Sequence, residues 1–106
     1  MALVKECYLL TRSFPKEEMF GLTSQIRRAA VSVPANIAEG YGRDNKGEYV
    51  QFLRIANGSL KELETHLLLC IDINLASPEG IDPILKRCDQ IGRMLRALIR
   101  SLQQSK

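Results

Sequence analysis

The stretch "IRRAAVSVPANIAEGYGR", residues 26–43, decides the fold class of this chain. Its apolar residues recur at helical spacing, and their phase does not change at Pro34. The complete stripe consists of Met19, Leu22, Ile26, Ala30, Val33, Ile37 and Tyr41. Proline inside a helix costs roughly 3 kcal/mol, but the alanines around Pro34 leave room for a kink. We therefore predict a kinked helix that ends at Gly40 and Gly42.

Two further helices are predicted next to this one. Residues 2–12 form a short helix, and Ser13 and Pro15 are typical of the start of the following helix. The apolar spacing over residues 48–71 predicts a long third helix, which Asp44 or Asn45 begins. Gly58 lies inside this third helix and indicates a close contact between helices.

The last predicted helix begins at Ser77-Pro78 or at Asp82-Pro83. Its apolar face is broader than a single seam, which suggests a second packing surface such as another subunit. Four helices joined by short connections predict an all-α fold, an antiparallel up-down four-helix bundle. The chain of 106 residues is expected to form one domain, residues 1–106.

Composition excludes several classes of protein. No stretch approaches the ~20 apolar residues of a membrane span, and the first residues lack a secretory cleavage site. Cys7, Cys70 and Cys88 are an odd number and lie far apart, so neither a disulfide framework nor a zinc site is predicted. We expect reduced core cysteines, a cytoplasmic protein and no membrane partner.

The sequence offers no recognisable catalytic or metal site. A di-iron bundle needs two Glu-x-x-His pairs, whereas this chain has a single histidine, His66, with Glu62 and Glu64 before it. No serine or cysteine is placed beside a base, so nucleophilic catalysis is not predicted either. We expect a protein that is not an enzyme and that uses no metal and no cofactor.

Basic residues gather near the carboxyl end of the chain. Residues 86–106 hold six Lys or Arg against one acidic residue, whereas residues 1–85 hold nine against eleven. The candidates for contact with nucleic acid are Lys86, Arg93, Arg96, Arg100, Arg43 and Lys46. Such residues bind phosphates by releasing counterions. The alternative is a solvated face or a rim of salt bridges between subunits.

A second polar group is predicted around the proline. It consists of Arg27, Arg28, Ser32, Asn36, Glu39 and Glu62, with Ser59 and Glu64 nearby in the pattern. Asn36 and Glu39 lie one turn apart beside Pro34, where they can bind backbone groups that the kink frees or pair with Arg27 or Arg28. We interpret this group as structural, with a binding site as the alternative.

Residues 10–43, "LTRSFPKEEMFGLTSQIRRAAVSVPANIAEGYGR", resemble the signature of small bacterial four-helix bundle proteins. These proteins are encoded in intervening sequences of 23S rRNA genes and are often called S23 ribosomal proteins. Residues 48–69 and 91–102 are similar to the third and fourth helices of the family. The resemblance implies a homopentamer and a kinship in fold with the accessory variability protein of diversity-generating retroelements. That relative partners a reverse transcriptase and nucleic acid.

The chain departs from the family pattern at its beginning, because family members usually start with a longer first helix that carries a tryptophan. We predict a non-enzymatic, oligomeric module that binds RNA or DNA through the basic flank of its last helix. The alternative is a structural scaffold that binds a partner protein and no nucleic acid.

Overall fold

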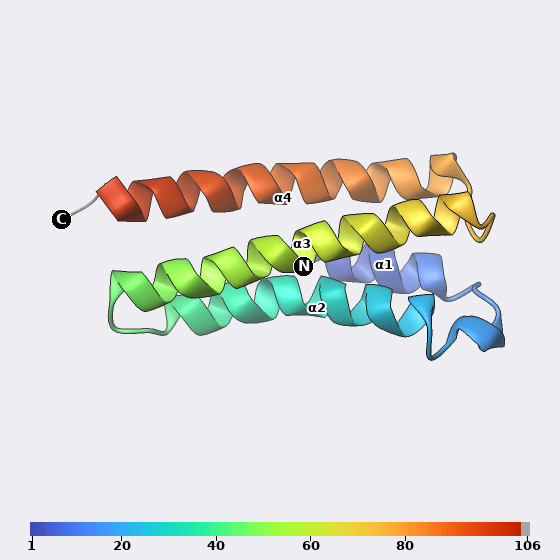
Figure 1. Cartoon of the computed structure of the whole chain (residues 1–106), viewed down its shortest axis with the longest axis horizontal. Coiled ribbons are helices and arrows are strands. Elements are labelled where there is room, and N and C mark those ends of the chain that lie inside the picture. Colours follow the sequence, from blue (N-terminus) through green and yellow to red (C-terminus); the bar gives the residue numbers. More distant parts are fainter. Residues whose placement is uncertain (105–106) are drawn as a thin grey trace.

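The computed structural model describes residues 1–104 and contains the expected bundle (Figure 1). Its elements are α1 (Ala2–Thr11), the short 3₁₀ helix η1 (Lys16–Glu18), α2 (Leu22–Tyr41), α3 (Lys46–Asp72) and α4 (Pro78–Gln104). The described residues contain no strand. The prediction of an all-α four-helix bundle is therefore confirmed.

Successive helices run antiparallel, and α3 lies between α2 and α4. The short α1 packs on α2 and α4, beside the half of the bundle where α3 ends and α4 begins (Figure 1). The molecule is elongated, with extents of 49 × 22 × 19 Å. Because α1 covers one half only, the other half is built mainly from three helices.

Leucine, isoleucine and alanine at helical spacing fill one continuous core. The fully buried side chains include Leu3, Ile26, Leu53, Leu60, Leu63, Leu67 and Ile81, which come from all four helices. Cys7, Cys70 and Cys88 are buried among them as free thiols. No helix within residues 1–104 is long and apolar enough to cross a membrane.

Side-chain caps decide where the last two helices begin. The Asn45 side chain accepts a hydrogen bond from the backbone N–H of Glu48 at 2.8 Å, as expected of an N-cap. At the next connection Ser77 accepts from the N–H of Gly80 at 3.2 Å, so α4 begins at Pro78. Of the two predicted starts, Ser77-Pro78 is therefore correct, and Pro83 lies inside the helix.

The predicted start of the second helix is wrong. Ser13 and Pro15 precede only the single turn of η1, and α2 begins at Leu22 after Gly21. The backbone of Gly21 leaves the helical region, with φ −105° and ψ −118°, which separates the two elements. Met19 therefore falls outside α2, where it is exposed rather than part of the apolar stripe.

The helix α2 continues through Pro34, as the unbroken apolar phase predicts. Its predicted end at Gly40 and Gly42 agrees with the observed last residue, Tyr41, but Gly40 itself lies inside the helix and is buried. A Cβ at this position would lie 2.8 Å from Cβ of Phe52 and 3.0 Å from Cδ1 of Tyr49. Gly40 therefore allows α2 and α3 to approach closely, and Gly42 closes the helix.

Candidate nucleic-acid interface

Three arginines from two helices meet in the groove between α3 and α4. Arg54 comes from α3, and Arg96 and Arg100 come from adjacent turns of α4. Together with Asn57, Ile99 and Gln103 they line a shallow depression of about 450 Å³. We call this site the arginine groove. Helical spacing explains its geometry, because residues four apart on α4 project from the same flank.

The three guanidinium groups are not neutralised by nearby carboxylates. Within residues 1–104, no acidic side chain forms an ion pair with Arg54, Arg96 or Arg100. All three side chains are exposed to solvent. A cluster of three cations without counter-charges attracts an anion from solution, and a guanidinium can bind a phosphate through two parallel hydrogen bonds.

The floor of the groove is shaped by a buried glycine and an amide. A Cβ at Gly92 would lie 3.1 Å from Nη1 of Arg96 and 3.8 Å from Oδ1 of Asn57, so both groups lie over this glycine. The Asn57 Oδ1 atom is buried and has no hydrogen-bond partner among the described residues. The missing side chain at position 92 allows the Arg96 guanidinium to lie back along α4.

The other predicted basic residues have different surroundings. Arg93 pairs with Asp89 at 3.0 Å, one turn earlier on α4. Arg43 pairs with Glu39 at 3.3 Å and with Glu48 at 4.0 Å. These two arginines are therefore partly neutralised, and the positive charge available to a ligand at each is reduced.

Lys46 and Lys86 do not join the three arginines directly. Lys46 lines a neighbouring depression of about 300 Å³ with Gly47, Val50, Leu102 and Gln103. Gln103 also lines the arginine groove, so the two depressions adjoin at the carboxyl end of α4. Lys86 is exposed nearer the beginning of the same helix.

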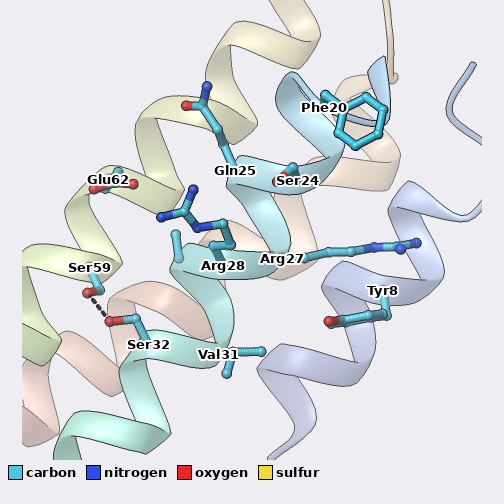
Figure 2. Close-up of a pocket in the computed structure, with 11 residues that line it drawn as sticks. Tyr8, Phe20, Ser24, Gln25, Arg27, Arg28, Val31, Ser32, Ser59 and Glu62 are labelled. Carbon is cyan, nitrogen blue, oxygen red and sulfur yellow. Dashed lines mark hydrogen bonds between the residues drawn. The ribbon is translucent and has the colours of Figure 1, made fainter. Parts of the chain in front are cut away.

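The predicted polar group around Pro34 divides into separate contacts. Ser32 and Ser59 share a hydrogen bond of 2.8 Å across α2 and α3, shown as a dashed line in Figure 2. Asn36 donates to the backbone oxygen of Ser32 at 2.8 Å and to its hydroxyl at 2.9 Å. Asn36 thus binds the carbonyl of residue 32, whereas the proline frees the carbonyl of residue 30.

The remaining members of that group point in different directions. Arg27 donates to Oγ1 of Thr11 at 2.9 Å and lies over the ring of Tyr8, at 4.5 Å from its centroid. Arg28 extends from the opposite side of α2 (Figure 2) and forms no ion pair with any residue in the range 1–104. The pairing of these arginines with Asn36 or Glu39, one of the two predicted alternatives, is therefore not observed within residues 1–104.

The three cysteine thiols are buried in the interior of the bundle. Burial raises the pKa of Cys7 and of Cys88 to about 12, and that of Cys70 to about 11. These thiols stay protonated at neutral pH and are weak nucleophiles. His66 lies 3.5 Å from Oε1 of Glu62, and the described residues contain no cluster of three metal-ligating side chains.

Comparison with known proteins identifies the family. The profile of the 23S rRNA-intervening sequence proteins matches residues 1–97, which is most of the chain. The chain belongs to this family. The fold is also that of a solved structure from Bacteroides thetaiotaomicron, described as a protein of unknown function from the S23 ribosomal protein family. The TM-score is 0.79 at 24% identity, and the match covers 92% of this chain and 88% of that one.

The likeness to the solved structure establishes the fold and not an activity, because the identity is low. No curated protein matches this sequence. The prediction that the chain resembles the 23S rRNA-intervening sequence family is confirmed by the family match.

Arg54 and Asn57 were not among the predicted site residues. These two residues lie three positions apart in α3, and both line the groove beside α4. The signal in the sequence was weak, because Arg54 is an isolated cation in the apolar pattern of that helix. Only the pairing of α3 with α4 brings it next to Arg96 and Arg100.

Proposed function

We propose that this chain is a non-enzymatic binding module that contacts the phosphate backbone of RNA through the arginine groove. The observation that carries the proposal is the meeting of Arg54, Arg96 and Arg100 without a carboxylate partner in residues 1–104. A groove of three cations fits a phosphate-rich ligand, and no described residue forms a base-reading motif beside it. Binding should therefore depend on charge more than on nucleotide sequence.

We further propose that the chain acts as an oligomer, with the homopentamer that the resemblance implies as the expected assembly. Large apolar side chains on the outside of the bundle support association, among them Phe20, Ile73 and Met94. The cytoplasmic location remains a prediction that rests on the free thiols. For the alternative, a partner protein in place of nucleic acid, residues 1–104 offer no comparable cluster of unpaired side chains.

Fluorescence anisotropy with a labelled RNA hairpin, an unpaired RNA of the same length and a duplex DNA tests the proposal. Three phosphate contacts predict that affinity falls by about 20- to 40-fold between 50 and 200 mM salt. The variant Arg54→Glu/Arg96→Glu/Arg100→Glu should lose this binding, while its helical circular dichroism stays unchanged. The charge-matched control is Lys5→Glu/Arg12→Glu/Lys16→Glu, which changes exposed cations near α1.

Two outcomes would refute the proposal. Absence of binding to all three nucleic acids at low salt would exclude them as ligands. Equal weakening by the groove variant and the control would show a diffuse attraction to net charge instead of a site. In either case the scaffold hypothesis would become the better description.

A further inference from the structure

The groove between α3 and α4 does not end at its three arginines. It continues toward the carboxyl end of α4 into the neighbouring depression of about 300 Å³, which is lined by Lys46, Gly47, Val50, Leu102 and Gln103. Gln103 also lines the arginine groove, so the two hollows share a wall. We call the second hollow the apolar depression, because the side chains of Val50 and Leu102 form its walls.

Helical spacing places the two hollows one turn apart. On α3, Val50 precedes Arg54 by four residues, and on α4, Gln103 follows Arg100 by three. Residues at these separations are neighbours on one face of a helix, and one turn rises by ~5.4 Å. A ligand that occupies both hollows therefore needs an anionic group and an apolar group joined by a short linker.

Val50 is the residue that points most clearly to a ligand. Its side chain is half-buried, and the apolar side chains packed against the core of residues 1–104 include Leu102 but not Val50. Single exposed apolar side chains are common on protein surfaces. Here, however, Val50 and Leu102 come from different helices and line one hollow beside a cluster of cations. This combination fits a ligand with two chemical parts.

Gly47 keeps the apolar depression open on the side of α3. Apart from its chain neighbours and the helix backbone, a Cβ at this position would meet only Oδ1 of Asn45, at 3.4 Å. A longer side chain would therefore occupy the depression. The other glycine of α3 is Gly58, where a close contact between helices was predicted. That contact is not observed, because no atom within residues 1–104 would lie within 4 Å of a Cβ there.

An unpaired nucleotide has the two parts that the groove requires. Its phosphate is anionic, and its base, which has apolar ring faces, is joined to the phosphate through one sugar. A base inside a duplex stays stacked on its neighbours, whereas proteins take up the splayed bases of single-stranded RNA. Contact with the faces of a base does not read its edge, so the depression should accept different bases. This agrees with binding that depends mainly on charge.

We propose that the α3–α4 groove binds an unpaired RNA nucleotide, with its phosphate against the three arginines and its base in the apolar depression between Val50 and Leu102. The inference rests on the proposed function and names the form of RNA that the same site takes. Double-stranded RNA would contact the arginines alone, because its bases remain stacked.

Removal of the bases from a single strand tests the proposal without changing the charge of the ligand. The probes are a labelled chain of ~8 uridines and the same chain with every base absent. Both carry the same phosphates, so counterion release contributes equally to the two affinities. Fluorescence anisotropy should show that the wild type binds the uridine chain about fivefold more tightly, because a base buries apolar area in the depression.

Two variants of the depression should abolish this fivefold difference. Val50→Ser removes an apolar wall, and Gly47→Leu fills the hollow with a side chain that also favours the helix. Affinity for the base-free chain should stay within about twofold of the wild type in both variants. The matched controls are Val31→Ser on α2 and Gly58→Leu on α3, at exposed positions outside the depression, and both should keep the difference. Circular dichroism checks that all four variants fold.

The outcomes separate this inference from the function on which it rests. A base effect that is lost only in Val50→Ser and Gly47→Leu supports the site. Equal affinity of the wild type for the two chains would overturn the inference and leave the phosphate site in place. A difference that survives in both variants would also overturn it, because the base would then lie elsewhere. Failure of the wild type to bind either chain at low salt would refute the proposed function as well.

Discussion

The two edges of α3 carry different chemistry. Toward α2, a hydrogen bond between Ser32 and Ser59 and the close approach at Gly40 join the helices, and the exposed surface carries charges of both signs, Arg28 and Glu62. Toward α4, the exposed rim carries Arg54, Arg96 and Arg100 without acidic partners in residues 1–104. An anion site therefore cannot be located by counting the basic residues on a helix. What locates it is the set of charges that remain after local pairing.

The largest effect is expected where α2 and α3 approach most closely. Gly40→Ala would place a Cβ 2.8 Å from Cβ of Phe52, which is fixed to the backbone, so the two helices must separate. We expect a loss of about 2 kcal/mol in the free energy of unfolding, as is usual for overpacking. Urea denaturation measures it. An unchanged midpoint would show that this edge is looser than its geometry indicates.

The next largest effect is expected on RNA affinity, when two arginines of α4 are substituted one at a time. Arg96→Glu should weaken RNA binding about tenfold, or about 1.4 kcal/mol, because it removes an unpaired cation from the groove. Arg93→Glu should weaken binding by much less, since its charge is already balanced by Asp89 at 3.0 Å. Anisotropy titrations at one salt concentration measure both. Equal losses would mean that the whole flank of α4 attracts RNA and that pairing with Asp89 is unimportant.

Smaller effects on stability are expected from polar side chains on the two edges of α3, Ser59 toward α2 and Asn57 toward α4. Ser59→Ala removes the hydrogen bond to Ser32 and should cost about 1 kcal/mol of stability. Asn57→Ala should cost less, because the buried Oδ1 atom of Asn57 has no hydrogen bond to lose in the described structure. Thermal unfolding of the two variants gives the comparison. If Asn57→Ala were the more damaging, its amide would have a structural role at the α3–α4 edge.

The smallest effect is expected from a substitution at Gly92, which alters the arginine groove without changing any charge. Gly92→Ala would place a Cβ 3.1 Å from Nη1 of Arg96, so the guanidinium must move away. Because this side chain is flexible, we expect only about a twofold loss of RNA affinity, or ~0.4 kcal/mol. Stability should not fall, since alanine favours the helix. A loss of stability instead would show that Gly92 serves packing rather than the placement of Arg96.

Much of the fold was predictable because helical periodicity is a local property. The apolar stripe from Ile26 to Ile37 predicted a continuous helix through Pro34, and Asp44 or Asn45 was predicted to begin the next helix, which Asn45 caps. The second helix was wrongly predicted to begin after Ser13. The sequence pattern shows a possible capping residue there, but it does not show the backbone break at Gly21. Gly40 was taken for a terminator for the same reason, because a helix end and a close contact both favour glycine.

The sequence by itself determined four amphipathic helices, their order and a basic carboxyl-terminal segment, because each depends on residues within a few turns of one another. Only the tertiary structure decided which basic residues meet. It brings Arg54 beside Arg96 and Arg100, although about forty positions of sequence separate them, and pairs Arg93 with Asp89. The physical reason is that net charge at a surface depends on neighbours across helices, and helix packing places those neighbours.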